Sequence, residues 1–372
     1  MASAPRLVNL QILRFVAAAL VVHAHAVDLS QRLGAAPAGL ATGALENFGA
    51  AGVDIFFVIS GFIITRTAGR ARSAGDFAVS RFWRVAPLYF LASLPWIAIR
   101  AAEGTLTGPM LIATFAFWPA AGPQVVAPAL AVGWTLSFEM LFYGVVALVL
   151  AAPRPRPAVL AALLAFAACW GLREATGLPT VQILGNPIIL EFLMGVAAAR
   201  LAPRLDRRAG AVLLTLGVAG FAAGLVHGFG RISELGEILP GTLSLARAAI
   251  WGIPALLVTL GAVALEPATT TSQIPANPGP IRRGLATLGD ASYALYLVHP
   301  LAFYGILQVV GFAPDLPGDL VILAALAACP ALALAVHTWI ERPLLARRPR
   351  LLNRARDRSI LSVRTTPPSS PT

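Results

Sequence analysis

Three ionisable side chains lie in the first apolar stretch of the chain, residues 8–27: Arg14, His23 and His25. Arg14 and His25 are eleven residues apart, close to three helical turns, so a helix would place both on one face about 16 Å apart along its axis. An imidazole exchanges protons near neutral pH, and a cation on the same face suits an anionic cosubstrate whose reactive end reaches His25. His23 lies about 200° around the helix from His25, so we expect His25 to be the working residue. The alternative is a structural arginine and histidine, each satisfied by a neighbouring helix.

Two carboxylates in other apolar stretches could orient this histidine. Asp54 lies in 47–66 and Glu139 in 129–151. An ionisable side chain at mid-bilayer costs at least about 2.5–3.5 kcal/mol, so it usually faces a polar cavity and has a partner. Glu139 and Tyr143 are four residues apart and face the same way on a helix, where they could orient an imidazole or bind a sugar hydroxyl. The alternative for Glu139 is a structural contact with an arginine of a neighbouring helix.

Two further clusters could bind substrates. Arg81 and Arg84 share a face at the start of a predicted helix, and guanidinium groups match phosphate oxygens through paired hydrogen bonds. Positively charged anchoring of that helix explains the pair equally well. Tyr296 and His299 also share a face, which suits a carbohydrate or an acyl chain. Here the alternative is an aromatic belt at the membrane interface.

Three other ionisable residues have plainer explanations. Arg247 lies near the end of an apolar stretch, where its side chain can extend to the interface. Glu191 can be satisfied by a neighbouring helix. Asp290 is assigned to the ninth apolar stretch, 286–310.

The whole chain must position these residues within a membrane. Of its 372 residues, 58% are hydrophobic and 12% are charged, whereas a soluble domain has about 25% charged residues. Runs of roughly 17–25 apolar residues can each span a bilayer. We therefore predict an all-α integral membrane protein of about ten transmembrane helices, at 8–27, 47–66, 80–100, 129–151, 157–173, 180–201, 210–229, 243–265, 286–310 and 318–341. A short apolar stretch at 110–119 is expected to be re-entrant or interfacial.

The net charge of +11 comes from 28 basic residues, all of them arginine. They cluster in every second loop and in the C-terminal tail, which explains the charge without a nucleic-acid partner. Because basic loops stay in the cytoplasm, we expect both termini to be cytoplasmic. Residues 1–345 would form the transmembrane domain, and 346–372 a basic and then disordered cytoplasmic tail. Cys169 and Cys329 lie in apolar stretches without a metal-binding pattern, and we expect no metal site.

Six motifs together resemble the membrane-bound acyltransferase-3 family. They cover about residues 7 to 345 and occur in the family's order: LQILRFVAAALVVHAHA, GVDIFFVISGFII, RFWRVAPLYF, WTLSFEMLFY, SYALYLVHP and ERP. The chain is most similar to the branch that acetylates bacterial exopolysaccharides and nodulation-type glycans. The resemblance implies a multi-pass protein of the bacterial inner (plasma) membrane.

The implied activity is O-acylation of a hydroxyl on a glycan or lipid-linked glycan, with acetyl-CoA as the donor. His25 matches the family's essential histidine, Arg14 its partner, and Glu139 its fourth-helix acid. Arg81 and Arg84 match the arginine pair associated with CoA. Many members carry two adjacent acids where this chain has Glu139 followed by methionine, so the second acid has no counterpart.

His25 would either deprotonate the sugar hydroxyl or accept the acyl group itself, with Asp54 or Glu139 orienting its ring. The alternative function is a secondary transporter or a glycan flippase that uses the intramembrane charges as an ion path.

Overall fold

The computed structural model describes residues 7–36, 39–41, 45–227, 234–267 and 279–347, and this part of the chain is helical, without a strand. Ten helices are long and apolar enough to cross a membrane, which confirms the prediction of an all-α fold with ten spans. Of the predicted tail, 346–372, the residues from 348 onward lie outside the part of the chain that the structure describes. The main helices of the spans are α1 (Val8–Arg32), α3 (Ala51–Ala68), α4 (Ala74–Ala102), α6 (Trp134–Ala151), α7 (Pro155–Thr176), α9 (Ile189–Leu201), α10 (Arg207–His227), α13 (Ile253–Ala264), α15 (Ser292–Val310) and α16 (Gly318–Val336).

Short helices extend or connect these spans. Two of them are π-helices, η5 (Ala248–Gly252) and η6 (His337–Glu341), each of which continues directly into the next helix. The others considered below are α5 (Gly108–Phe115), α12 (Ser244–Arg247), α14 (Pro280–Asp290) and α17 (Arg342–Ala346).

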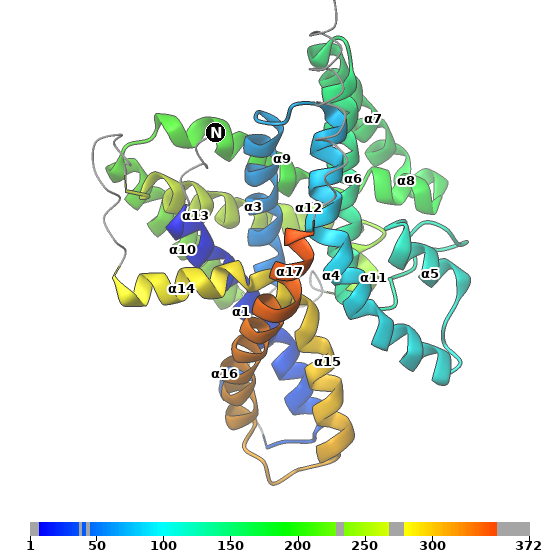
Figure 1. Ribbon diagram of the computed structural model, residues 1–372, viewed down its shortest axis with the longest axis vertical. Helices are drawn as coiled ribbons and strands as arrows, with labels where there is room; N and C mark the ends of the chain where they lie inside the picture. The colour runs from blue at the N-terminus through cyan, green and yellow to red at the C-terminus, as the bar shows by residue number, and fades with distance from the viewer. Residues whose placement is uncertain (1–6, 37–38, 42–44, 228–233, 268–278, 348–372) are drawn as a thin grey trace, which may run out of the picture.

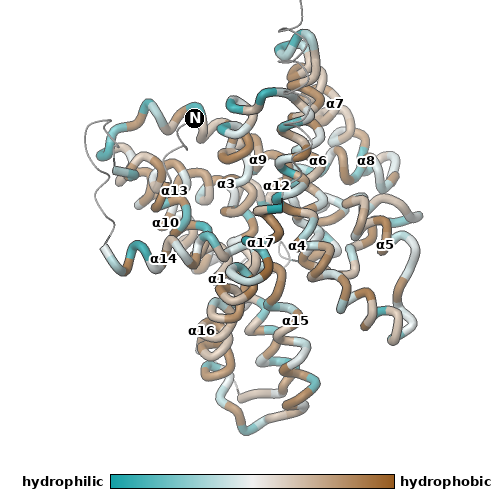
Figure 2. The backbone as a smooth tube through the Cα atoms, viewed as in Figure 1, coloured by the Kyte–Doolittle hydropathy of each residue, from teal (hydrophilic) through white to brown (hydrophobic). Residues whose placement is uncertain are grey.

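The outer surface of the bundle is apolar, as a bilayer requires. Helix α7 has no buried residue, and its Leu160 and Leu164 are about three-fifths exposed. Brown, hydrophobic segments accordingly run along the outer helices in Figure 2. In a soluble protein such surfaces would be covered, whereas lipid covers them here.

Helix α1 lies at the centre of the arrangement and contacts α3, α13, α14, α15 and α16. Figure 1 shows α1, α15 and α16 side by side, with the α15–α16 connection at one end of the bundle and the α3–α4 connection at the other. The residues that α1 carries can therefore meet side chains from four other spans, those of α3, α13, α15 and α16.

The prediction of one continuous ninth span at 286–310 is wrong. The chain breaks at Ala291, where α14 ends and α15 begins, and the two helices run in different directions (Figure 1). Helix α14 is strongly amphipathic: one of its faces is polar, and the face that carries Ala286 and Gly289 is buried against the bundle. Asp290 therefore belongs to the end of α14 and not to a span.

The apolar stretch at 110–119 forms only α5, eight residues long. A helix of that length covers about 12 Å and is too short to cross the hydrocarbon core. The expectation that this stretch does not span the membrane is confirmed.

Helices α3 and α9 pack tightly because each has a glycine at the crossing. A Cβ at Gly61 would collide with the carbonyl oxygen of Phe192, and one at Gly195 with that of Val58. Small residues let membrane helices approach closely where lipid removes the hydrophobic driving force between them. This contact places Asp54 and Ser60 of α3 against the centre of the bundle.

We predict that Gly195→Ala lowers the free energy of unfolding by about 1–3 kcal/mol, the usual effect of overpacking. The measurement is thermal unfolding of the detergent-purified protein. Gly144→Ala is the matched control, because no atom lies within 4 Å of the added Cβ there. Equal stability of the two variants would contradict the close packing of α3 on α9.

Candidate active site

A cavity of about 320 Å³ lies among α1, α3, α4, α6 and α15. It brings together Arg14, Arg81, Arg84, Glu139 and Tyr143, which are separated by up to 129 positions in the chain. Three guanidinium groups around one small space favour an anionic ligand. The remaining polar side chains of its lining are Gln11, Ser60, Thr135, Ser292, Tyr293 and Tyr296.

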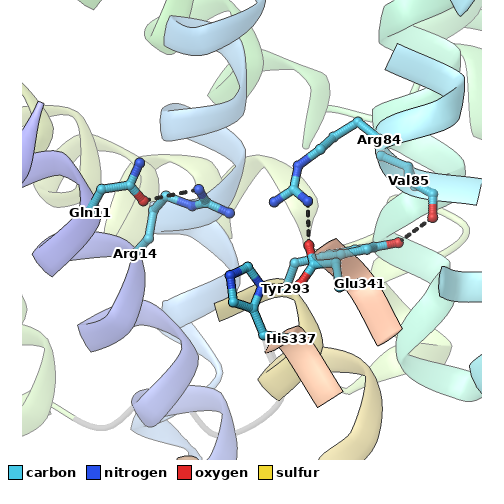
Figure 3. Close-up of polar contacts among 7 residues, drawn as sticks. All are labelled: Gln11, Arg14, Arg84, Val85, Tyr293, His337 and Glu341. Atoms are coloured by element: carbon cyan, nitrogen blue, oxygen red, sulfur yellow. Dashed lines mark hydrogen bonds and ion pairs between the residues drawn. The ribbon is translucent and has the colours of Figure 1, made fainter. Parts of the chain in front are cut away.

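Arg14 has no carboxylate partner among the hydrogen bonds and ion pairs of the described residues. Arg14 donates a hydrogen bond to the neutral amide oxygen of Gln11 at 3.1 Å. Figure 3 shows the guanidinium groups of Arg14 and Arg84 extending toward the same space from α1 and α4. Two positive charges that line one cavity repel each other. An anion between the two guanidinium groups would offset this repulsion. The set fits an anionic ligand such as one with phosphate groups.

Glu139 is held in the same cavity by two hydroxyl groups. Ser60 and Tyr143 donate to its Oε1 atom at 2.7 and 2.6 Å. Its Oε2 atom has no donor among the described residues and is available to a ligand. The sequence indicated the Glu139–Tyr143 contact through i, i+4 spacing, whereas Ser60 carried no such signal because it comes from another helix.

His25 lies beyond this cavity. It lines two further cavities of about 180 and 380 Å³, which also share Asp28 and Val132. The 180 Å³ cavity and the arginine cavity have Val53 and Tyr296 in common. These two residues therefore form the wall between the arginine side and the His25 side.

The tyrosine of this wall is fixed by hydrogen bonds. The Tyr296 hydroxyl donates to the carbonyl oxygen of Val132 at 2.7 Å and lies 2.9 Å from the Thr135 hydroxyl. Tyr296 is thus held by hydrogen bonds at the place where both cavities meet.

Two imidazole rings lie side by side on the His25 side of the Tyr296 wall. The ring centroids of His25 and His299 are 5.1 Å apart. His299 donates from Nδ1 to the carbonyl oxygen of Leu295 at 3.0 Å, so a neutral ring carries its lone pair on Nε2. That Nε2 atom is buried and has no partner in the described structure.

Asp28 is a neighbour of His25 that sequence reasoning missed. Its Oδ2 atom lies 3.5 Å from Nδ1 of His25, and the i, i+3 spacing on α1 was the available signal. His23, by contrast, donates to the carbonyl oxygen of Leu40 at 2.9 Å and lines none of the cavities described above. These positions favour His25 as the reactive histidine of α1.

Asp54 has a different partner from the one considered in the sequence. Both of its carboxylate oxygens accept hydrogen bonds from Arg247, at 2.9 and 2.7 Å. A direct bond to His25 is absent among the described contacts, and an orienting role for Asp54 stays a prediction. Arg247, and not Asp54, lines the 180 Å³ cavity together with His25.

The expectation that Arg247 extends to the membrane interface is wrong. Its side chain is 1% exposed, and its guanidinium lies 4.8 Å from the centre of the Trp251 ring. Arg247 ends α12, and the π-helix η5 follows directly. Hydropathy alone could not reveal a carboxylate on α3 that reaches this buried cation.

These features define a multi-helix membrane protein with a cavity lined by three arginines and, beyond it, a partly exposed histidine that lies beside a buried one, and the sequence comparisons identify its class. The family model described as an acyltransferase domain, that of the acyltransferase-3 family, matches residues 7–339. The chain therefore belongs to this family and is a membrane acyltransferase.

A particular relative is the exopolysaccharide production protein ExoZ of Rhizobium meliloti (strain 1021). The two are 33% identical over 320 residues, which cover 82% of this chain and 92% of ExoZ. No solved structure matches the chain.

We predict that Asp54→Asn destabilises the protein by about 3–5 kcal/mol, because it removes the carboxylate that accepts two hydrogen bonds from the buried Arg247 cation. The loss would appear as a lower midpoint of thermal unfolding in detergent. Glu174→Gln is the matched control, since Glu174 pairs with Arg173 but is 80% exposed and such pairs contribute little. Equal midpoints for the two variants would show that the Asp54–Arg247 pair does not support the fold.

Proposed function

We propose that this protein transfers an acetyl or short acyl group from acyl-CoA to a hydroxyl of a cell-surface or exported glycan. One observation carries the proposal: α1 presents Arg14 to the arginine cavity and His25 to the cavities beyond the Tyr296 wall. A charged donor and a neutral acceptor can then approach one reactive group from opposite sides.

The arginine cavity suits the donor. CoA carries several phosphate groups, and Arg81 and Arg84 present guanidinium forks of the kind that bind phosphate. Both residues lie in the first half of α4, a short distance after Arg70 and Arg72. Because basic loops remain in the cytoplasm, the donor would enter from that side, and both chain termini would face it.

The wider cavity suits the acceptor. It has a volume of about 380 Å³ and contains His25, Trp96 and Tyr304 together with Arg32 and Arg100. Aromatic faces with polar neighbours are suited to sugar rings. The name of the similar ExoZ protein refers to exopolysaccharide production, which supports an exopolysaccharide as the acceptor.

His25 would supply the acid–base chemistry. As a general base, it takes the proton of the acceptor hydroxyl while the oxygen attacks the thioester carbon. The carbon–sulfur bond breaks, and the imidazolium returns the proton to the leaving thiolate. As a nucleophile, it would first accept the acyl group and then release it to the hydroxyl. Both routes begin with the neutral ring.

We predict that His25→Ala lowers acyl transfer by about 10²–10⁴-fold, the usual contribution of a general base. Isolated membranes are supplied with labelled acetyl-CoA, and surface glycans are analysed by mass spectrometry from cells with wild-type, variant or no protein. His23→Ala is the matched control, because His23 lies on the same helix but bonds to a loop carbonyl.

An acetyl group that requires the wild-type protein and survives His23→Ala but not His25→Ala would support the assignment. Transfer that persists in His25→Ala would refute the role of His25. Glycans that are the same with and without the protein, together with no label transfer in membranes, would refute O-acetylation from acetyl-CoA.

A further inference from the structure

The last span continues without a break into a segment that packs against α4 beside the arginine cavity. The π-helix η6 and helix α17 contact α4 and contain the ERP motif at 341–343. Trp83 donates from its indole nitrogen to the carbonyl oxygen of Leu344 at 3.0 Å. The adjacent Arg84 bonds through Nη1 to Oε1 of Glu341. This attachment joins the C-terminal end of the bundle to a residue that lines the cavity.

Glu341 is fully engaged and buried. Its side chain is 1% exposed, and its second oxygen, Oε2, lies 2.7 Å from Nδ1 of His337. His337 and Glu341 are the first and last residues of η6. Single turns of π-helix occur often at functional sites. Figure 3 shows Glu341 between Arg84 on one side and His337 on the other.

Arg84 is also held from a second direction. Its guanidinium carbon lies 5.5 Å from the centre of the Tyr293 ring. That ring is fixed, because the Tyr293 hydroxyl donates to the carbonyl oxygen of Val85 at 2.7 Å. The Arg84 side chain is nevertheless 27% exposed and lines the cavity. Its Nε and Nη2 atoms have no acceptor among the described residues, which leaves them available to an anion.

The charge balance explains why a carboxylate belongs at this place. Arg14, Arg81 and Arg84 surround one cavity and repel one another in a medium of low dielectric constant. Without a counter-charge, Arg84 would turn away toward water. Glu341 offsets one positive charge from behind the guanidinium, and Glu139 offsets another within the cavity. Three arginines against two carboxylates leave a net positive charge that attracts phosphate.

We propose that Glu341, supported by His337, is a positioning residue that holds Arg84 toward the phosphate groups of the acyl donor. The inference rests on the proposed acyl-CoA donor. Glu341 does not touch the donor in this arrangement; it acts through Arg84, much as outer-shell partners orient metal ligands. The ERP segment then determines donor affinity, and the acyl-transfer step itself is left to other residues.

The test compares two donors with the full-length protein in detergent or membranes. Acetyl-CoA carries the phosphate groups, whereas acetyl-pantetheine keeps the thioester and lacks them. Glu341→Gln should raise KM for acetyl-CoA about tenfold, since a hydrogen bond to a charged group contributes about that much. It should leave kcat and the KM for acetyl-pantetheine unchanged within about twofold. Glu174→Gln is the matched control: Glu174 belongs to an exposed ion pair with Arg173 and lines none of the cavities described above, so this variant should change none of these constants.

Three further variants, Arg84→Lys, His337→Asn and His337→Ala, separate positioning from general structural support. Arg84→Lys and Glu341→Gln should be non-additive in KM for acetyl-CoA, because residues that act through one interaction do not add. His337→Asn places an amide near the position of Nδ1 and should restore the KM that His337→Ala raises. If Glu341→Gln does not accumulate as folded protein, the comparison of His337→Ala with His337→Asn provides the test.

The outcomes distinguish this inference from the proposed function. A wild-type protein that does not use acetyl-CoA refutes the donor and with it both proposals. Turnover by the wild type with an unchanged KM in Glu341→Gln overturns only the positioning role. So does a KM that rises equally for both donors, or additive effects of Arg84→Lys and Glu341→Gln, because each indicates a general structural defect.

Discussion

A charged group surrounded by hydrocarbon must find a partner or water, and this constraint determines how the helices of the protein are arranged. Asp54 on α3 and Arg247 on α12 are both nearly inaccessible, and each neutralises the other across the bundle. Glu341 is buried in the same way against Arg84. In a bilayer, leaving either member unpaired would cost several kcal/mol. Each pair therefore ties two distant segments together and limits where the neighbouring cavities can form.

The paired charges separate structural from reactive groups. Asp54 and Glu341 have both oxygens engaged by protein partners, so they support other side chains. Arg14 and the Nε2 atom of His299 lack such strong partners in the described structure. Unsatisfied polar groups inside a membrane protein are expensive. Arg14 lines the arginine cavity, and His299 lies beside His25, which lines the two cavities beyond it.

Helix α1 connects the two halves of the site. Its contact with α15 brings the wall residue Tyr296 between the cavity that Arg14 lines and the one that His25 lines. A rigid helix keeps Arg14 and His25 about three turns apart, whatever the connecting loops do. The family match over residues 7–339 covers all of these elements, which agrees with a site assembled from the whole bundle.

The number of spans could be predicted from the sequence because each depends on local properties, namely length and apolar content. The shared faces of Arg14 with His25 and of Glu139 with Tyr143 followed from helical periodicity. The break at Ala291 and the burial of Arg247 could not be predicted, because both depend on contacts with other helices. Only the tertiary structure decided that Ser60 donates a hydrogen bond to Glu139, that Asp54 pairs with Arg247, and that Glu341 pairs with Arg84. Within a membrane the partner of a charge comes from whichever helix packs beside it, and that proximity is not encoded in local spacing.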